Sequence, residues 1–309
     1  MSAAVDQRTL PHSLVGGRYA VVAHLAQGGM GEVFHVRETS TGRDMALKRL
    51  LLSASRASAL FQAEYHALAR LRHPFIVEVY DYGLDEGRPY YTMELLGGAD
   101  LRDCGPTSIT DACLHLRDVA SSLALLHAQR LVHRDISPRN VRKTETGRCK
   151  LFDFGTMVPY GIPPNVAGTS PFISPEALDG AMLDQRADLY SLGALGYWLV
   201  SGELHAAPRA LDRRVADRTM PSRLTRVRPE VPAALDDLIM ALLEPDPGRR
   251  PWSAHEVIAR LNAIGNLPID DSVALARSHL GSSRMVGRRR ELDAARRSSA
   301  GSVRRTGSA

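Results

Sequence analysis

The sequence of 309 residues lacks any long hydrophobic run. Its longest apolar stretch, residues 192–200, is far shorter than the roughly 20 residues that a membrane-spanning helix requires. The first residues also lack the pattern of a charged segment followed by an apolar one that marks a secretion signal. These absences argue against a membrane span and against secretion, so we expect a cytoplasmic protein.

Cysteine is scarce as well. The three cysteines show neither CxxC pairing nor the spacing of metal ligands, which predicts reduced thiols and no structural metal. No segment of about 20–50 residues repeats along the chain, which excludes solenoids and propellers.

Net positive charge is absent from most of the chain. The formal net charge is +5, but residues 281–309 hold eight arginines against two carboxylates and carry +6, which leaves −1 for residues 1–280. The basic character therefore belongs to the tail, and we expect no nucleic-acid binding by the folded body.

What is present is 44% hydrophobic and 24% charged residues, a composition typical of a globular protein with a sizeable core. Residues 1–17 are predicted to be a flexible leader. Residues 18–96 consist mainly of strand patterns separated by hairpin turns, with one helix over 53–71. Residues 97–264 have helical periodicity, and the remaining 45 residues are rich in Ser, Gly and Arg. The sequence therefore predicts an α+β fold, with a small antiparallel β-sheet lobe and a larger, mainly α-helical lobe.

Several helix details follow from the same patterns. Asp111 is expected to cap one helix, and Ser253 with Glu256 to form a capping box at another. The apolar stripe of the helix over 53–71 is expected to consist of residues at three-to-four spacing: Ala63, Ala67, Leu68 and Leu71.

Two features of the first lobe could serve phosphate chemistry. In the turn LAQGGMGEVF, Gly28 and Gly31 have no Cβ, so backbone N–H groups could approach phosphate oxygens. Lys48 lies on an apolar strand, where a buried ammonium needs a partner, and Glu64 on the next helix is the natural one. Taken singly, each feature has a plain structural explanation: a glycine-rich hairpin, a lysine that reaches the surface, and a solvated glutamate.

The order of the motifs decides between these explanations. After the glycine turn, the lysine and the glutamate come five further motifs: HRDISPRN (133–140), KLFDFG (150–155), GTSPFISPE (168–176), DLYSLG (188–193) and DPGRRP (246–251). The series resembles the eukaryotic-like (Hanks-type) protein kinases, specifically the bacterial serine/threonine kinases, over residues 18–264. The resemblance implies a bilobal kinase fold, with residues 18–96 as the N-lobe and 97–264 as the C-lobe.

The resemblance also implies a set of residues around ATP. The glycine turn would cover the phosphates, Lys48 held by Glu64 would bind them, and the hinge would meet the adenine. The implied nucleotide-binding residues are Ala26, Gly28, Gly31, Val33, Ala46, Lys48, Glu64, Met93, Glu94, Leu96 and Asp153.

For catalysis, the resemblance implies that Asp135 orients the substrate hydroxyl and accepts its proton. Asn140 and Asp153 would hold Mg²⁺, with Mn²⁺ as an alternative ion, because hard cations take oxygen ligands. Asp135, Lys48 and Asn140 are thus candidate catalytic residues.

The chain departs from the family pattern at two positions. Ala26 replaces the first glycine of the turn, and Ser137 replaces a lysine that would meet the γ-phosphate. Arg139, four residues after Asp135, stands where tyrosine kinases carry an arginine. Our hypothesis is that Arg139 supplies the missing cation, against the simpler interpretation of an exposed surface charge.

The activation segment has its own signals. In this family an arginine such as Arg134 often binds a phosphorylated loop residue, yet Asn165 and Val166 stand where related kinases carry threonines. We therefore expect activity that does not depend on loop phosphorylation. Thr169 in the GT pair is expected to contact Asp135 and favours Ser/Thr substrates.

The remaining matches concern structure. Glu176 and Arg250 are expected to form a buried ion pair. The stretch SRMVGRRREL at 283–292 resembles the entry segment of ATPase modules that follow some bacterial kinase domains, so residues 265–309 are either a largely disordered tail or the truncated start of such a module.

The expected function is transfer of the ATP γ-phosphoryl group to Ser/Thr hydroxyls of proteins, which could include the kinase itself. The first alternative is a pseudokinase scaffold that binds nucleotide and partners with little or no turnover, as Ala26 and Ser137 would suggest. The second is a small-molecule kinase, which the segment from GT to PE disfavours.

Overall fold

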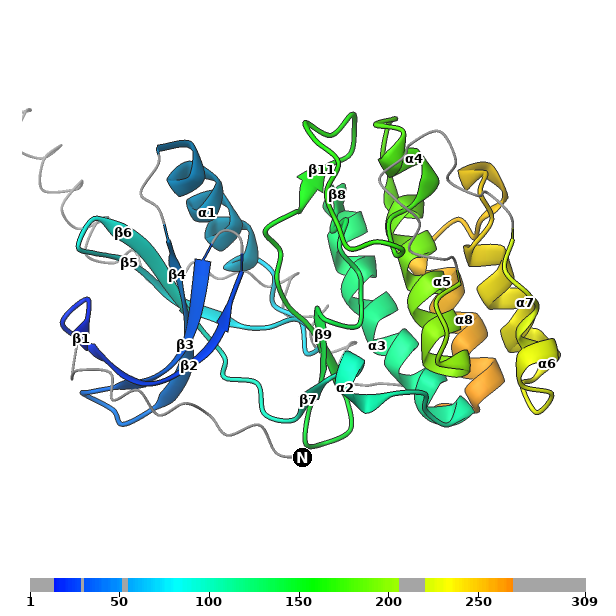
Figure 1. Cartoon of the computed structure of the whole chain (residues 1–309), viewed down its shortest axis with the longest axis horizontal. Helices are drawn as coiled ribbons and strands as arrows, with labels where there is room; N and C mark the ends of the chain where they lie inside the picture. The colour runs from blue at the N-terminus through cyan, green and yellow to red at the C-terminus, as the bar shows by residue number, and fades with distance from the viewer. Residues whose placement is uncertain (1–13, 29–30, 52–54, 206–219, 269–309) are drawn as a thin grey trace, which may run out of the picture. The chain divides into compact units, whose positions relative to one another are not determined.

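The structure is a computed structural model, and placement is described for four segments of the chain: 14–28, 31–51, 55–205 and 220–268. Most predictions for the leader, and those for the tail beyond residue 268, lie outside the described residues. Strands dominate up to Met93 and helices dominate after it (Figure 1). The structure thus confirms the predicted α+β architecture of a small antiparallel sheet lobe with one helix and a larger helical lobe.

The strands of the described residues form one large and two small sheets. They are β1 (Leu14–Val15), β2 (Tyr19–Gln27), β3 (Gly31–Glu38), β4 (Asp44–Leu50), β5 (Val79–Asp85), β6 (Arg88–Met93), β7 (Ala99–Asp100), β8 (Leu131–Val132), β9 (Val141–Lys143), β10 (Cys149–Leu151) and β11 (Val158–Pro159).

The large sheet is antiparallel, with the strand order β1-β2-β3-β4-β6-β5. Its register pairs Lys48 on β4 with Val33 on β3 and with Tyr91 on β6, and it pairs Ala46 with Met93. Directly paired residues point to the same side of a sheet, as do residues two apart on one strand. The register therefore collects these five side chains on one face, which becomes the face of the candidate site.

Helix α1 (Ser55–Leu68) packs against that face, but its buried side differs from the predicted stripe. Phe61, Glu64 and Leu68 are buried, whereas Ala63 is exposed and Ala67 only half-buried. Two of the four predicted stripe residues, Leu68 and Leu71, are buried as expected, and the prediction was wrong for Ala63 and Ala67 because it counted only apolar residues. The helix instead turns a large aromatic ring and a partnered carboxylate toward the sheet.

The other helices belong to the second lobe. They are α2 (Leu101–Cys104), α3 (Ile109–Ala128), α4 (Pro175–Leu178), α5 (Gln185–Ser201), α6 (Leu224–Val227), α7 (Ala233–Leu242), α8 (Ala254–Gly265) and a 3₁₀ turn at Pro247–Arg249. Ser108, not Asp111 as predicted, caps α3, because its hydroxyl accepts the Asp111 N–H at 3.1 Å. At α8 the Ser253 hydroxyl accepts the Glu256 N–H as predicted, but the Glu256 carboxylate accepts the N–H of Trp252 rather than that of Ser253, so the capping box is only half formed.

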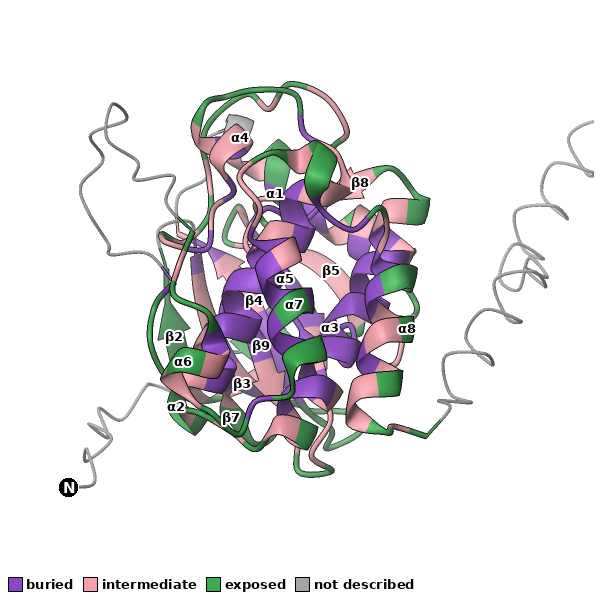
Figure 2. Ribbon diagram, turned by 90° about the vertical axis from the view of Figure 1, so that its right-hand side faces the viewer, coloured by how far each residue is buried: buried purple, intermediate pink, exposed green. Residues whose placement is uncertain are grey.

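Helices α3 and α5 form the centre of this lobe. Most of their residues are buried, whereas α7 and α8 keep an exposed outer side (Figure 2). The two small sheets, β7-β9-β10 and β8-β11, hold the segments between the helices. Residues 133–140 lie between β8 and β9, and residues 152–157 follow β10, so paired strands fix both ends of each candidate loop.

The predicted ion pair of the second lobe is confirmed. Arg250 donates to both carboxylate oxygens of Glu176, at 2.6 and 2.9 Å, and its side chain is fully buried. The same guanidinium also donates to the backbone carbonyls of Arg186, Glu244 and Pro245. A buried pair with every donor used is costly to break, because the partner is left charged and unpaired.

We therefore expect Arg250→Ala to lower the free energy of unfolding by roughly 3–5 kcal/mol. For a domain of this size that loss corresponds to a fall in Tm of roughly 6–20 °C, measurable by calorimetry. Arg249→Ala is the matched control, because among the described residues its exposed side chain makes only a distant ion pair, with Asp246, and its loss should change stability by about 0.5 kcal/mol or less. Equal Tm values for the two variants would show that the buried pair contributes nothing.

Candidate functional site

Lys48 is the centre of the site. Its ammonium donates to Glu64 Oε1 at 2.9 Å and to Asp153 Oδ1 at 3.1 Å, which joins the sheet, α1 and the segment after β10. The side chains of Lys48 and Glu64 are 15% and 7% exposed, whereas that of Asp153 is about half exposed. The predicted lysine–glutamate pair is therefore present, and one carboxylate of the trio remains open to solvent.

The opposite charges of this trio keep one another ionised. Burial alone would lower the pKa of Lys48, but the neighbouring carboxylates of Glu64 and Asp153 outweigh that effect and hold the pKa well above its usual value. Limited hydration would raise the pKa of Asp153, but the charge and hydrogen bond of Lys48 outweigh it and hold this pKa below its usual value. At neutral pH the site therefore presents a cation beside an ionised carboxylate.

Asp135 and Asn140 form the second group of the site. Asn140 Nδ2 donates to the Asp135 backbone carbonyl at 2.9 Å and to Asp135 Oδ2 at 2.8 Å. The other carboxylate oxygen, Oδ1, is shielded and has no hydrogen-bond partner among the described residues. A buried acceptor without a donor is costly, so Asp135 keeps unused hydrogen-bonding capacity on this oxygen.

Asp188 holds the loop that carries Asp135 through hydrogen bonds to the loop backbone. This fully buried carboxylate accepts the backbone N–H groups of His133 and Arg134 at 2.9 Å each. Arg134 has φ of +70° and Asp153 has φ of +61°, both in the left-handed region that costs a side-chain-bearing residue roughly 1–2 kcal/mol. Such conformations persist only where surrounding contacts enforce them, and they are typical of functional sites.

His133 and Phe154 pack against each other beside the site. The His133 ring is fully buried and meets the Phe154 ring edge-on, with 4.8 Å between centroids. Burial lowers the pKa of His133, so the ring is neutral at physiological pH. It joins the loop of Asp135 to the segment of Asp153.

Ser137 and Arg139 lie in different surroundings. The Ser137 side chain is fully buried, and its hydroxyl has no hydrogen-bond partner in the segments that the structure describes. Arg139 is exposed and makes no ion pair with any described residue. The structure therefore turns Ser137 into the protein, and the cation role of Arg139 stays a prediction.

The glycine turn is described only in part, since residues 29 and 30 lie outside the described segments. Gly28 N–H donates to Gly31 C=O at 2.9 Å, and a Cβ on Gly28 would meet no atom closer than 4.0 Å. A Cβ on Gly31 would lie 2.6 Å from the Arg49 carbonyl, so the spacing of β3 and β4 alone requires this glycine. Ala26 is exposed on β2 opposite Val33.

The segment after β6 connects the two lobes. Met93 and Leu96 are half-buried against the main core, and the Glu94 N–H donates to the Glu78 carbonyl at 2.8 Å. Lys150 on β10 donates to both carboxylate oxygens of Glu94 at 2.6 and 2.7 Å, a contact that the sequence analysis missed. This ion pair ties the predicted hinge to the strand that leads to Asp153.

The predicted anchor for a loop phosphate already has partners. The Arg134 guanidinium donates to the Thr156 carbonyl at 2.6 Å and to the Asn165 carbonyl at 2.9 Å, with longer contacts to the Asn165 side chain. Asn165 thus takes the place predicted for a phosphorylated residue. The expected contact of Thr169 with Asp135 is not found, because no hydrogen bond joins them in the described part of the chain.

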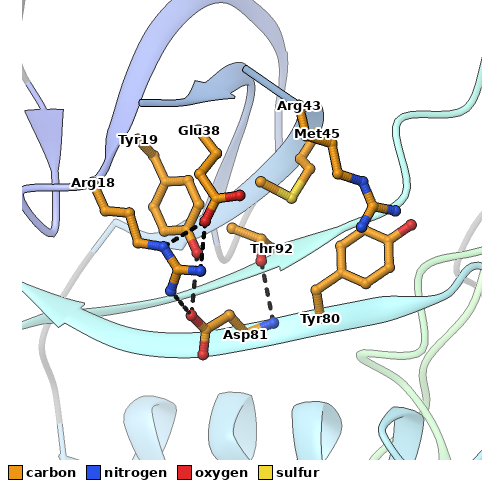
Figure 3. A pocket seen from close by; sticks show the side chains of 8 residues that line it. All are labelled: Arg18, Tyr19, Glu38, Arg43, Met45, Tyr80, Asp81 and Thr92. Carbon is orange, nitrogen blue, oxygen red and sulfur yellow. Dashed lines mark hydrogen bonds and ion pairs between the residues drawn. The ribbon is translucent and has the colours of Figure 1, made fainter. Parts of the chain in front are cut away.

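A separate pocket of about 200 Å³ opens on the large sheet (Figure 3). Its lining residues Met45 and Thr92 adjoin residues of the site face in sequence and therefore point to the opposite face. Within it, Arg18 is paired with both Glu38 and Asp81. The other cation of the lining, Arg43, stacks on the Tyr80 ring at 4.1 Å, so the pocket is lined by two arginines and two carboxylates.

The oxygen atoms at the site suit a divalent hard cation. Asp153 offers a carboxylate and Asn140 an amide oxygen, and the Phe152 N–H donates to the Asn140 carbonyl at 3.0 Å, which joins their two segments. No cluster of three or more His, Cys, Asp and Glu that could hold a metal occurs among the described residues. Two protein oxygens are typical of Mg²⁺, which completes its shell with substrate phosphates and water.

Comparison with known proteins places these features in a family context. The sequence profile of the protein kinase domain matches residues 19–260. The chain is 34% identical over 278 residues to the serine/threonine-protein kinase pkn2 of Myxococcus xanthus, covering 82% of this chain and 33% of the relative. It is 34% identical over 254 residues to the serine/threonine-protein kinase PknA of Mycobacterium tuberculosis, covering 76% and 58%.

A solved kinase-domain structure is also similar to this chain. The kinase domain of Mycobacterium tuberculosis PknI aligns with a TM-score of 0.65 and 29% sequence identity, covering 82% of this chain and 98% of that domain. The curated relatives are longer, since the chain spans only 33%, 42% and 50% of the lengths of three of them. The similarity therefore concerns the kinase domain rather than the whole of those proteins.

Proposed function

Because the chain belongs to the protein kinase domain family, we propose that it is an ATP-dependent serine/threonine protein kinase. The observation that carries this proposal is the joint geometry of two groups. Lys48 bonded to Glu64 and Asp153 provides the phosphate-binding cation, and Asp135 bonded to Asn140 provides an acceptor oxygen that has no partner among the described residues. A pseudokinase scaffold has no need for the second group.

In the reaction, Asp135 Oδ1 accepts the hydrogen bond and then the proton of a substrate hydroxyl. The hydroxyl oxygen forms a bond to the γ-phosphorus while the bond to the leaving ADP breaks. Lys48 holds the α- and β-phosphates, and Asn140 fixes the carboxylate of Asp135 through its Oδ2. Positioning and charge neutralisation, rather than covalent catalysis, lower the barrier.

Asp153 and Asn140 would hold Mg²⁺, with Mn²⁺ as an alternative. The ion would neutralise charge on the phosphates, and the open carboxylate of Asp153 is the residue best suited to bind it. Ala46, Val33 and Met93 line the same face of the sheet and would pack on the adenine.

The substrates would be serine and threonine residues of proteins, with the kinase itself among them. No described helix has both the length and the apolarity to cross a membrane. We place the activity in the cytoplasm, where ATP is available.

The test uses the purified chain, γ-labelled ATP, Mg²⁺ and a generic protein substrate. We expect label on serine and threonine but not on tyrosine, lost when the divalent ion is chelated and restored by Mg²⁺ or Mn²⁺. Label on tyrosine alone would contradict the proposed specificity, and ATP binding without label would favour the scaffold.

The contacts of Arg134 support activity that does not need a phosphorylated loop. Its guanidinium is already occupied by the carbonyls of Thr156 and Asn165, and the Thr156 hydroxyl donates to the His133 carbonyl at 2.8 Å. Phosphatase treatment should therefore leave kcat within about twofold of the untreated value, because no charge-assisted contact is removed. A phosphosite at residues 156–170, found by mass spectrometry and required for turnover, would refute this expectation.

A further inference from the structure

Glu64 has a second donor that the motif series does not account for. The Tyr91 hydroxyl donates to Glu64 Oε1 at 3.0 Å, the same oxygen that accepts from Lys48 at 2.9 Å. Tyr91 is 1% exposed, so this bond forms in the interior of the lobe. One carboxylate oxygen therefore links the sheet lysine and a sheet tyrosine to α1.

The sheet register places Tyr91 for this contact. Tyr91 on β6 is the direct partner of Lys48 on β4, and the Lys48 ammonium lies 5.9 Å from the centre of the Tyr91 ring. From α1, the rings of Phe61 and Tyr65 pack on it at 5.0 and 6.0 Å between centroids. Tyr91 thus contacts the lysine, the glutamate and the helix that carries the glutamate.

The two donors of Glu64 differ in what else they bind. Lys48 divides its ammonium between Glu64 and Asp153, and in the proposed reaction it must also bind phosphates. The Tyr91 hydroxyl has a single proton, and its one hydrogen bond as a donor goes to Glu64. Burial raises the pKa of Tyr91 far above its usual value, so the hydroxyl stays protonated and remains a donor.

We propose that Tyr91 is a positioning residue, whose hydroxyl holds Glu64 and α1 in place so that Lys48 keeps its orientation toward the phosphates of ATP. The inference rests on the proposed kinase function. A buried carboxylate needs donors, and a hydrogen bond to a charged group is stronger than one between neutral groups. The tyrosine supplies such a donor independently of the lysine.

The test compares Tyr91→Phe with the matched control Tyr65→Phe. Both variants remove one hydroxyl from the interface between α1 and the sheet, but the Tyr65 hydroxyl donates to the Tyr80 carbonyl at 3.3 Å and does not touch Glu64. For Tyr91→Phe we expect kcat/KM for ATP to fall about 10- to 100-fold, with the Kd for ATP raised about threefold or more. Tyr65→Phe should stay within about twofold of the wild type in both quantities.

A double-mutant cycle separates positioning from general stability. If Tyr91 acts through Glu64, Tyr91→Phe should add little to the loss caused by Glu64→Gln, whereas independent effects would multiply. Wild-type Kd and kcat for ATP from Tyr91→Phe, or losses that multiply in the double variant, would overturn the proposal. If the wild type binds ATP without phosphate transfer, the proposed function fails, and the Kd comparison still decides the role of Tyr91. If the wild type does not bind ATP at all, both proposals fail.

Discussion

Replacing Asp135 by asparagine is expected to lower kcat about 10²- to 10⁴-fold, the range for loss of a general base. Asparagine has the same shape, and its amide oxygen can keep the bond with Asn140 Nδ2 that Asp135 Oδ2 makes. The amide nitrogen would then occupy the place of Oδ1, the atom without a partner, and it cannot accept a proton. The substrate hydroxyl would thus meet a donor instead of a base.

The control for this variant is that the properties unrelated to proton transfer stay unchanged. The Kd for ATP and the Tm should stay close to those of the wild type, because Lys48, Glu64 and the buried contacts of Asp188 are unchanged. Single-turnover kinetics at saturating ATP isolates the chemical step from product release. A kcat within about threefold of the wild type would show that Asp135 is not the base.

The second large effect concerns the cation near the γ-phosphate. We expect Arg139→Ala to lower kcat about 10²- to 10³-fold, as the loss of one electrostatic contact to the transition state does. Ser137→Ala should change kcat by about twofold or less, because that side chain is fully buried and its hydroxyl bonds to no described residue. Removing a buried hydroxyl without a partner should leave the stability unchanged or raise it slightly.

Arg139→Lys is the informative companion to these two variants. Lysine keeps the positive charge but not the planar fork of donors, so we expect partial recovery of kcat relative to Arg139→Ala. The opposite ranking, with Ser137→Ala severe and Arg139→Ala mild, would show that the charge comes from elsewhere. In that case the exposed Arg139 would be an ordinary surface residue.

Much of the site could be predicted because the motif order fixes which residues meet. Lys48 with Glu64, and Glu176 with Arg250, were paired from the sequence alone, and both pairs are present. Those pairs connect positions that the fold always brings together, so the resemblance carried them. The cap at Ser253 was predictable for a different reason, because it depends on only four consecutive residues.

The errors arose where the outcome depends on three-dimensional detail. The stripe on α1 was right at Leu68 and Leu71 but missed Glu64, which is buried with its partners and which no hydrophobic pattern reveals. Ser108 rather than Asp111 caps α3, since both residue types suit a cap and only the backbone decides between them.

Contacts that depend on strand pairing escaped the sequence altogether. The bond of Tyr91 to Glu64 requires knowing that β6 lies beside β4 in a particular register, and the Lys150–Glu94 pair requires β10 to approach the hinge. The burial of Ser137 belongs to the same class, because an octet of letters does not say which way a side chain turns.

The central claim is that the Lys48 and Asp135 groups together transfer phosphate from ATP to a protein hydroxyl. The most direct measurement is single-turnover transfer of labelled phosphate, with Mg²⁺, by the wild type and Asp135→Asn at equal ATP occupancy. The account predicts transfer by the wild type and a rate at least about 100-fold lower for the variant. ATP binding by both without transfer by either would contradict it, and would identify a nucleotide-binding scaffold instead of an enzyme.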